Sequence, residues 1–216
     1  MEIVDILARW GHFLAGITWI GLLYYFNFVQ TEYFKEADGD ARTDAFSKLV
    51  PRALWWFRWG AMFTFLTGVI MLGYRGSGST ADITVGAVLG TLMFLNVWLI
   101  IWPNQKIIIA SNQSVGGGGE ADPAAAGAAP KAGLASRTNT LFSLPMLYFM
   151  GSSTHMSTGA IGDNSTAIIV CLVIIAILEG NSIFGKQGPM TTVRGVIVSG
   201  FVLTLLLWGV LNLNRM

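Results

Sequence analysis

Six long runs of apolar residues, separated by polar segments, dominate the sequence of 216 residues. Each run approaches or exceeds the roughly 20 residues that an α-helix needs to cross the hydrocarbon core of a bilayer. The pattern therefore predicts an all-α, polytopic membrane protein, a bundle of about six transmembrane helices. The expected spans are Ile6–Gln30, Ala53–Gly73, Ile83–Trp102, Thr138–Met156, Thr166–Phe184 and Val193–Leu213, with ends uncertain by a few residues.

The composition agrees with a membrane protein and excludes other classes. Apolar residues make up 53% of the chain and charged residues only 12%. A water-soluble enzyme with so few charges would expose large apolar patches, so that class is excluded. A net charge of +1 without a basic face excludes nucleic-acid binding. The single cysteine, Cys171, excludes an internal disulfide and a c-type haem attachment motif.

Charge asymmetry between the connections predicts the orientation. Lysine and arginine gather in the connections after the first, third and fifth spans, which places these in the cytoplasm and both termini on the outer, periplasmic side of a bacterial inner (cytoplasmic) membrane. Residues 1–216 form a single membrane domain, in which the Gly-, Ala- and Pro-rich segment 111–136 is expected to be a flexible cytoplasmic loop. The cytoplasmic set is Lys35, Arg42, Lys48, Arg52, Lys106, Lys131, Arg137, Lys186 and Arg194, against Arg9, Arg75 and Arg215 outside.

The two histidines, His12 and His155, both fall in the outer half of the predicted bilayer. Gly16 follows His12 by four residues and Gly151 precedes His155 by four, so each glycine lies one turn deeper than its histidine, on the same face. Neutral imidazole is a usual axial ligand of haem b, and glycine leaves bare backbone beside a flat macrocycle. We therefore predict haem b, with His12 and His155 as the axial ligands of its iron.

Two other residues of the first span fit the same site. Arg9, one turn outward of His12, is placed to meet the anionic propionates, and Trp19, two turns deeper, to form an aromatic wall. Simpler interpretations remain open: His155 as a hydrated residue at a helix end, and His12 as a core histidine bonded to a backbone carbonyl. A metal site without a porphyrin lacks ligands, because no intramembrane Asp, Glu or Cys lies nearby.

A second polar group is expected near the cytoplasmic face. Arg58 in the second span and Glu179 in the fifth lie roughly 8 Å deep by helix rise. They form either a buried ion pair that fixes helix packing or, with Gln105, a polar pocket open to the cytoplasm. In that pocket Arg58, Gln105 and Glu179 are the candidate catalytic residues, and indole rings would help to stack a planar anionic heterocycle. Its other members would be Asn104, Asn139, Trp55, Trp56 and Trp59.

Four segments in the first four spans carry a family resemblance: RWGHFLAGITWIGLLYYFNFVQ, WWFRWGAMFTFLTG, NVWLIIWPNQK and SRTNTLFSLPMLYFMGSSTH. They resemble the membrane domain of the bacterial membrane-bound urate oxidase (urate hydroxylase) family. The resemblance implies oxidation of urate to 5-hydroxyisourate, with electrons leaving through cytochrome c, and a redox role for His12 and His155. Full-length members carry a C-terminal cytochrome c domain, so we expect a short form that lacks it.

Two functions remain open on the sequence. The first is a haem-b-binding membrane oxidoreductase or electron-transfer subunit that passes electrons from urate or a similar planar substrate to an external cytochrome. The absence of the cytochrome c domain leaves three possibilities: a separate cytochrome accepts the electrons, the substrate has changed, or catalysis has been lost. The second is a non-catalytic accessory subunit of a larger respiratory or photosynthetic complex. A transporter is disfavoured, because the charged groups lie in the outer and inner thirds of the spans rather than at the midplane.

Overall fold

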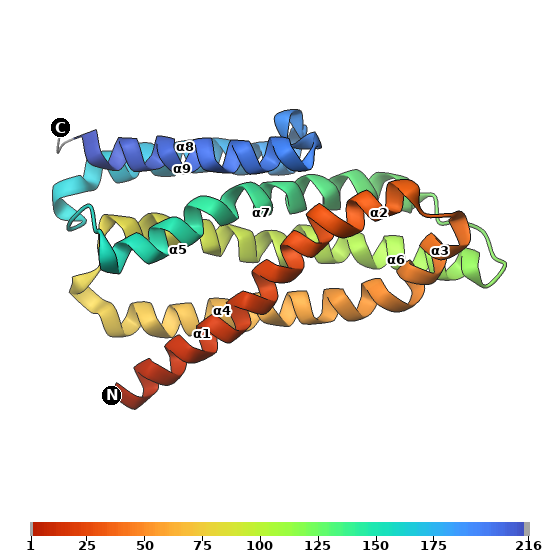
Figure 1. Cartoon of the computed structure of the whole chain (residues 1–216), viewed down its shortest axis with the longest axis horizontal. Helices are drawn as coiled ribbons and strands as arrows, with labels where there is room; N and C mark the ends of the chain where they lie inside the picture. Colours follow the sequence, from red (N-terminus) through yellow and green to blue (C-terminus); the bar gives the residue numbers. More distant parts are fainter. Residues whose placement is uncertain (1, 214–216) are drawn as a thin grey trace.

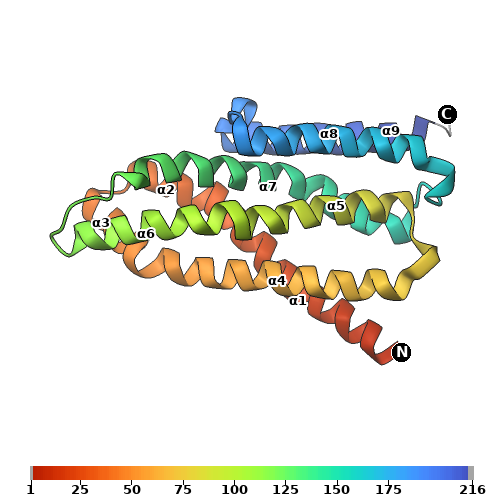
Figure 2. The same ribbon diagram turned by 180° about the vertical axis from the view of Figure 1, so that it is seen from behind.

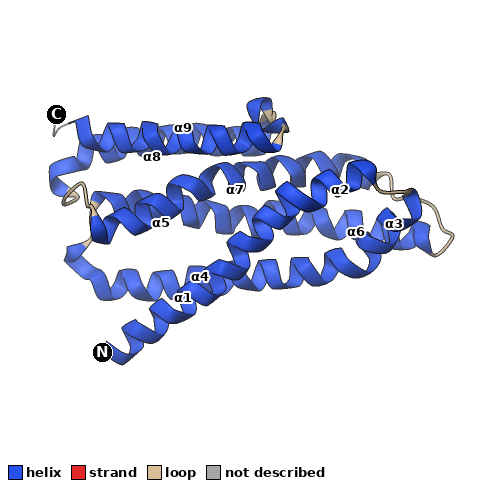
Figure 3. Ribbon diagram, in the orientation of Figure 1, coloured by secondary structure: helices blue, strands red, loops and turns tan. Residues whose placement is uncertain are grey.

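A computed structural model gives the structure of the chain and describes residues 2–213. Within these residues the chain is almost entirely helical, and Figure 3 shows helices joined by short loops. Six long helices run roughly along one direction, with α1 crossing the others obliquely (Figure 1). The all-α prediction is therefore confirmed. Arg215, which the charge pattern places outside, lies beyond the described residues.

Three of the long helices are built from several segments without a break, and each of these contains a π-helical stretch. They are α1 (Glu2–Tyr24), η1 (Tyr25–Gln30) and α2 (Thr31–Glu36); α3 (Gly39–Asp44), η2 (Ala45–Leu49) and α4 (Val50–Arg75); and α5 (Ala81–Leu95), η4 (Asn96–Ile101) and α6 (Trp102–Gly116). The others are α7 (Ala124–His155), α8 (Ser165–Phe184) and α9 (Val193–Asn212). Short 3₁₀ turns, η3 (Gly76–Gly78), η5 (Gly162–Asn164) and η6 (Gly188–Thr191), lie in the connections.

The connection between α6 and α7 is shorter than the sequence predicts. Helix α6 ends at Gly116 and α7 begins at Ala124, so much of the expected loop 111–136 is helical (Figure 2). Alanine has the highest helix propensity of all residues, and the alanine-rich stretch from 124 onwards therefore extends α7 rather than a linker. Only residues 117–123 remain as the connection.

Four helices in the described part of the chain are long and apolar enough to cross a membrane: Glu2–Glu36, Ala81–Gly116, Gly162–Phe184 and Val193–Asn212. They support a membrane protein, whereas the expected count of six spans is not confirmed by this measure. The two long helices outside the set contain α4 and α7. Helix α7 carries a run of buried polar residues that lowers its hydropathy: Arg137, Thr138, Asn139, Thr140 and Ser143.

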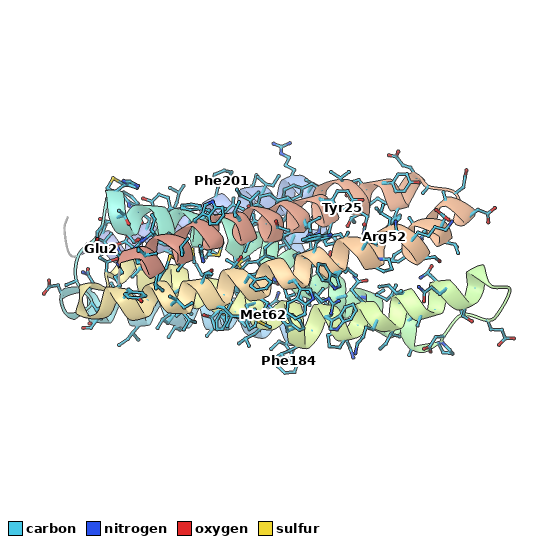
Figure 4. All side chains as sticks on the ribbon, turned by 90° about the horizontal axis from the view of Figure 1, so that it is seen from below. Glu2, Tyr25, Arg52, Met62, Phe184 and Phe201 are labelled. Atoms are coloured by element: carbon cyan, nitrogen blue, oxygen red, sulfur yellow. The ribbon has the colours of Figure 1, made fainter. Side chains whose placement is uncertain are left out.

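The periphery of the bundle is apolar. Phe184 is 88% exposed and Phe201 is 62% exposed, and Figure 4 shows both side chains at the edge of the bundle. A soluble protein rarely exposes contiguous apolar surface of this kind, whereas lipid tails solvate it without cost. The side chains with the least exposure, among them Leu23, Leu89 and Phe142, form the core between the helices.

Helix α7 is the central element and packs against α5, α6 and α9. Glycines let these helices approach closely, because a Cβ on Gly86 of α5 would lie 3.2 Å from the backbone nitrogen of Met150. A Cβ on Gly200 of α9 would lie 2.9 Å from Leu144 Cδ2. These two glycines therefore let α5 and α9 pack closely against α7.

A buried carboxylate fixes the segment that follows α7 to the start of α5. Asp82 has no exposed surface and accepts hydrogen bonds from the Ser152 hydroxyl at 2.7 Å, the Thr158 backbone nitrogen at 2.7 Å and the Thr158 hydroxyl at 2.6 Å. An isolated β-bridge between Thr80 and Ala160 supports the same contact. The C-terminal end of α7 is thereby held in one position.

Replacing Asp82 with asparagine tests this anchor. An amide nitrogen cannot accept a hydrogen bond, so Asp82→Asn should lower the stability of the fold by about 2–3 kcal/mol. Thermal exposure of the buried thiol of Cys171, followed with a thiol-reactive fluorophore in detergent, measures the effect. The control Asp163→Asn changes an exposed carboxylate in the connection to α8 and should leave the midpoint unchanged. Equal midpoints for both variants would contradict the anchor.

Candidate functional site

Two side-chain contacts align the first long helix with α7. Tyr24 Oη lies 2.9 Å from Ser143 Oγ, and Asn27 Nδ2 donates to Ser136 Oγ at 2.8 Å. The Ser143 hydroxyl donates its own hydrogen to the Thr140 carbonyl at 2.7 Å, so the Tyr24 hydroxyl is the donor to Ser143. The two helices are antiparallel, and residues equally far from these contacts therefore lie at similar levels of the bundle.

By this alignment His12 and His155 lie at about the same level. Each is 12 residues from the Tyr24–Ser143 contact (24 − 12 and 155 − 143), which is about 18 Å at the rise of an α-helix. The Asn27–Ser136 contact aligns His12 with Gly151 instead, one turn from His155. Figure 1 shows α1 running obliquely and diverging from α7 toward this end. Within the described residues, no hydrogen bond joins the two imidazoles.

The imidazole of His12 is oriented by α4. Its Nδ1 lies 3.1 Å from Thr67 Oγ1, and the Thr67 hydroxyl donates its hydrogen to the Phe63 carbonyl at 2.6 Å. Because the Thr67 hydrogen goes to a carbonyl of its own helix, we assign Nδ1–H of His12 as the donor to Thr67, which leaves the lone pair on Nε2. The Thr64 backbone is a further hydrogen-bond partner of His12, which agrees with the simpler interpretation of a core histidine bonded to a carbonyl. A Cβ on Gly68 would lie 3.3 Å from His12 Cε1, so Gly68 makes room for the ring. Histidines that bind a metal through one ring nitrogen usually donate the N–H of the other nitrogen to a nearby acceptor, as Nδ1 of His12 does to Thr67.

The surroundings of His155 are more open. His155 is the last residue of α7 and is exposed, and a Cβ on Gly151 would meet nothing within 4 Å. The structure therefore leaves free space on the face of α7 that carries this glycine. Gly16 differs, because a Cβ there would lie 3.9 Å from Thr64 Cγ2, and Gly16 faces α4 in the helix contact.

Arg9 and Trp19 both make contacts within the protein: Arg9 pairs with a residue of its own helix, and Trp19 packs against α4. Arg9 Nε forms an ion pair with Asp5 Oδ2 at 2.8 Å, one turn away on the same helix. Trp19 is only 2% exposed, and a Cβ on Gly60 of α4 would lie 3.1 Å from its backbone nitrogen. Trp19 therefore lies in the contact between α1 and α4, and its Nε1 has no hydrogen-bond partner among the described residues.

The structure separates Arg58 from Glu179, so the interpretation as an ion pair is wrong. The Arg58 Cζ lies 3.3 Å from the centroid of the Trp102 ring, and its guanidinium is stabilised by this cation–π contact. Glu179 Oε2 instead accepts a hydrogen bond from Asn96 Nδ2 at 3.1 Å. Helix rise predicts the depth of both residues but not the direction in which each side chain points. Gln105 contacts neither of them by hydrogen bond.

The carboxylate of Glu179 belongs to an amide network in the core. Asn96 Nδ2 also donates to Asn139 Oδ1 at 3.0 Å, and Asn139 Nδ2 donates to the Met93 carbonyl at 2.9 Å. Asn96 belongs to η4, Asn139 to α7 and Glu179 to α8. The network therefore joins three helices and satisfies polar groups that would otherwise destabilise the apolar interior.

A separate polar cavity of about 300 Å³ lies between the first long helix, α4, α6, α7 and η6. Three atoms of its lining residues are buried without a hydrogen-bond partner: Gln30 Oε1, Gln105 Oε1 and Arg137 Nη1. Arg137 is only 4% exposed. A buried, unpaired polar atom costs about 1–3 kcal/mol, so three in one cavity require an explanation. Of the predicted pocket residues, Gln105 is the one that lines this cavity.

Sequence reasoning missed Gln30 and Arg137 as members of a site. It places Gln30 at the end of the first span and Arg137 in a cytoplasmic loop, because it starts the fourth span at residue 138. Helix α7 in fact begins at Ala124, which brings Arg137 well inside a helix. The available signal was an arginine among small polar residues, SRTNT, directly before an apolar run.

Comparison with known proteins gives one match. The family described as urate oxidase N-terminal matches residues 74–210, more than half of the chain of 216 residues. No curated protein and no solved structure shows a significant match. The matched range contains Gln105, Arg137 and His155, whereas His12 and Gln30 precede it. The chain belongs to the urate oxidase N-terminal family, the domain of the membrane-bound urate oxidases.

Proposed function

We propose that this protein is a haem-b-binding membrane oxidoreductase that oxidises urate or a similar planar heterocycle and passes the electrons to a cytochrome. The observation that carries the proposal is the placement of His12 and His155 at about one level of the bundle, with Nε2 of His12 left as a lone-pair donor. Membership of the urate oxidase N-terminal family supports the class of substrate.

Two features at this end of the bundle support a haem. The Nδ1–H of His12 is held by Thr67, which is the second partner that an axial imidazole usually has. The backbone at Gly151 is bare and uncovered, beside the exposed ring of His155. When bound, the haem would supply a one-electron redox centre.

The chain's own residues would hold and orient that group. Thr67 fixes the tautomer of His12, and the three hydrogen bonds to Asp82 fix the end of α7 that carries His155. Arg9 lies one turn outward of His12 with about half of its side chain exposed, where it can exchange Asp5 for a propionate. Thr67 and Asp82 thus act as positioning residues rather than as ligands.

The chemistry of urate oxidation requires an electron acceptor outside this domain. Conversion of urate to 5-hydroxyisourate adds one oxygen atom from water and releases two electrons and two protons. An external one-electron acceptor such as a cytochrome would therefore have to accept an electron twice per substrate. The charge pattern predicts that the histidine end faces the periplasm of a bacterial inner membrane, where a soluble or membrane-bound cytochrome c would be the partner.

Removal of either histidine should abolish haem binding. The purified protein should contain about one haem b per chain in a pyridine haemochrome assay, and His12→Ala and His155→Ala should each lose most of it. Phe13→Ala and Met156→Ala change exposed neighbours of the two histidines and serve as matched controls with full haem content. Folded wild-type protein without haem would contradict the proposal. Co-purification of such protein with a large complex would favour an accessory subunit instead.

Thr67 should tune the haem without ligating it. Thr67→Val removes the acceptor for His12 Nδ1–H, and loss of such a partner typically weakens metal binding about 10–100-fold. The reduction potential should shift as well, and Thr67→Ser should restore both properties because it keeps the hydroxyl. Thr18→Val, which removes a hydroxyl bonded only to the Leu14 carbonyl of its own helix, is the control. Wild-type haem affinity and potential in Thr67→Val would contradict the assigned tautomer.

A further inference from the structure

The three unpaired polar atoms of the polar cavity come from three different helices. Gln30 ends η1, Gln105 lies in the first turn of α6, and Arg137 lies within α7. Each buries an atom that has no partner in the described part of the chain, although nearby polar groups are paired: Asn27 donates to Ser136 inside the same lining. Convergence of unpaired atoms from separate elements on one cavity is the pattern expected of a ligand site.

The charge of the lining selects an anion. Arg137 and Lys35 are the charged residues among those that line the cavity, and the described lining contains no Asp or Glu. Lys35 is bonded to Glu32 at 2.8 Å, and the same carboxylate, which does not line the cavity, also interacts electrostatically with Arg137. Nη1 of Arg137 is nevertheless buried without a hydrogen-bond partner. A guanidinium in a site of low dielectric binds an anionic oxygen strongly. The cavity is therefore complementary to a negative group placed at Arg137.

Shape and hydrogen bonding narrow the ligand further. About 300 Å³ is the low end of ligand-site volumes and suits a small ring system. Phe26 and Phe57 line the cavity, with their ring centroids 5.4 Å apart in an edge-to-face arrangement, and provide an aromatic wall for a flat ligand. The carbonyl oxygens of Gln30 and Gln105 accept hydrogen bonds, so the ligand must carry N–H groups as well as the anionic oxygen.

The backbone around the cavity is irregular in the same places. The π-helical stretch η1 supplies Phe26, Asn27 and Gln30 to the lining, and η4 supplies Ile101 and ends directly before α6, which carries Gln105. π-Helical turns inside α-helices are rare and frequently occur at functional sites. The irregular backbone therefore marks the same cavity as the unpaired side chains.

We propose that this cavity binds a planar heterocyclic anion that carries N–H groups, with Arg137 donating to its anionic oxygen and Gln30 and Gln105 accepting from its N–H groups. The assignment rests on the proposed function in taking this ligand as the substrate to be oxidised. Arg137 and His155 are 18 residues apart on α7 (155 − 137), about 27 Å along the helix, so the ligand does not touch the haem. Binding is therefore measurable separately from haem content.

Equilibrium binding of urate to the purified full chain in detergent tests the site. Wild type should bind urate and gain thermal stability from it, since a ligand stabilises the state that it binds. Arg137→Met should weaken binding at least 10-fold without lowering the melting temperature of the free protein, because it removes a buried guanidinium whose Nη1 has no hydrogen-bond partner. Arg52→Met removes an exposed arginine at the same end, outside the cavity, and should bind as wild type does.

Two further measurements complete the test. Gln105→Glu directs a carboxylate at the anion and should weaken urate binding as Arg137→Met does. Trimethylxanthine, a neutral ring system without N–H groups, should not compete with urate. Wild-type affinity in Arg137→Met, or equal binding of trimethylxanthine, overturns the proposed site.

The outcomes also separate this proposal from the haem. If the protein lacks haem but still binds urate in a way that depends on Arg137, the cavity site is supported and the proposed haem-dependent oxidation is contradicted. If the protein contains haem but Arg137→Met binds urate as wild type does, the cavity site is contradicted, whereas the assignment of the haem ligands is not. Haem content and urate affinity should be determined on the same preparation, so that the two outcomes can be compared directly.

Discussion

Polar side chains inside an apolar bundle must be paired, and helix α7 is where this constraint governs the structure. Arg137, Asn139 and Ser143 are all buried in a helix whose neighbours present mainly apolar faces. Each pairing also fixes a neighbouring helix: Tyr24 through Ser143, and η4 and α8 through Asn139 and Asn96. The polar residues that reduce the hydropathy of α7 are thus the ones that set the alignment of the helices.

Three of the exceptions to this constraint lie together at the cavity proposed as a ligand site. Arg137 and its two glutamine neighbours leave atoms unpaired, at the end of the bundle opposite to the histidines. The Tyr24–Ser143 contact lies between the two regions, so α7 and the first long helix connect them directly.

The sequence predicts part of this arrangement because depth follows from helix rise. The all-α class and the common level of His12 and His155 depend on position along a helix, which periodicity reports well. The family follows from the four motif-bearing segments instead. The direction of a side chain depends on tertiary packing, and here prediction was weaker. Arg58 faces Trp102 rather than Glu179. Arg137 was hidden by a helix boundary placed 14 residues late (138 − 124), because alanine-rich sequence also resembles a linker.

The central claim is that electrons from a bound planar anion reach a haem held by His12 and His155. Its most direct test is anaerobic addition of urate to the oxidised, haem-containing protein, with the α-band of the haem followed by absorbance. Reduction of the haem by urate, and none by trimethylxanthine, is the expected result. A haem that stays oxidised in the presence of bound urate, but is reduced by dithionite, would contradict the account.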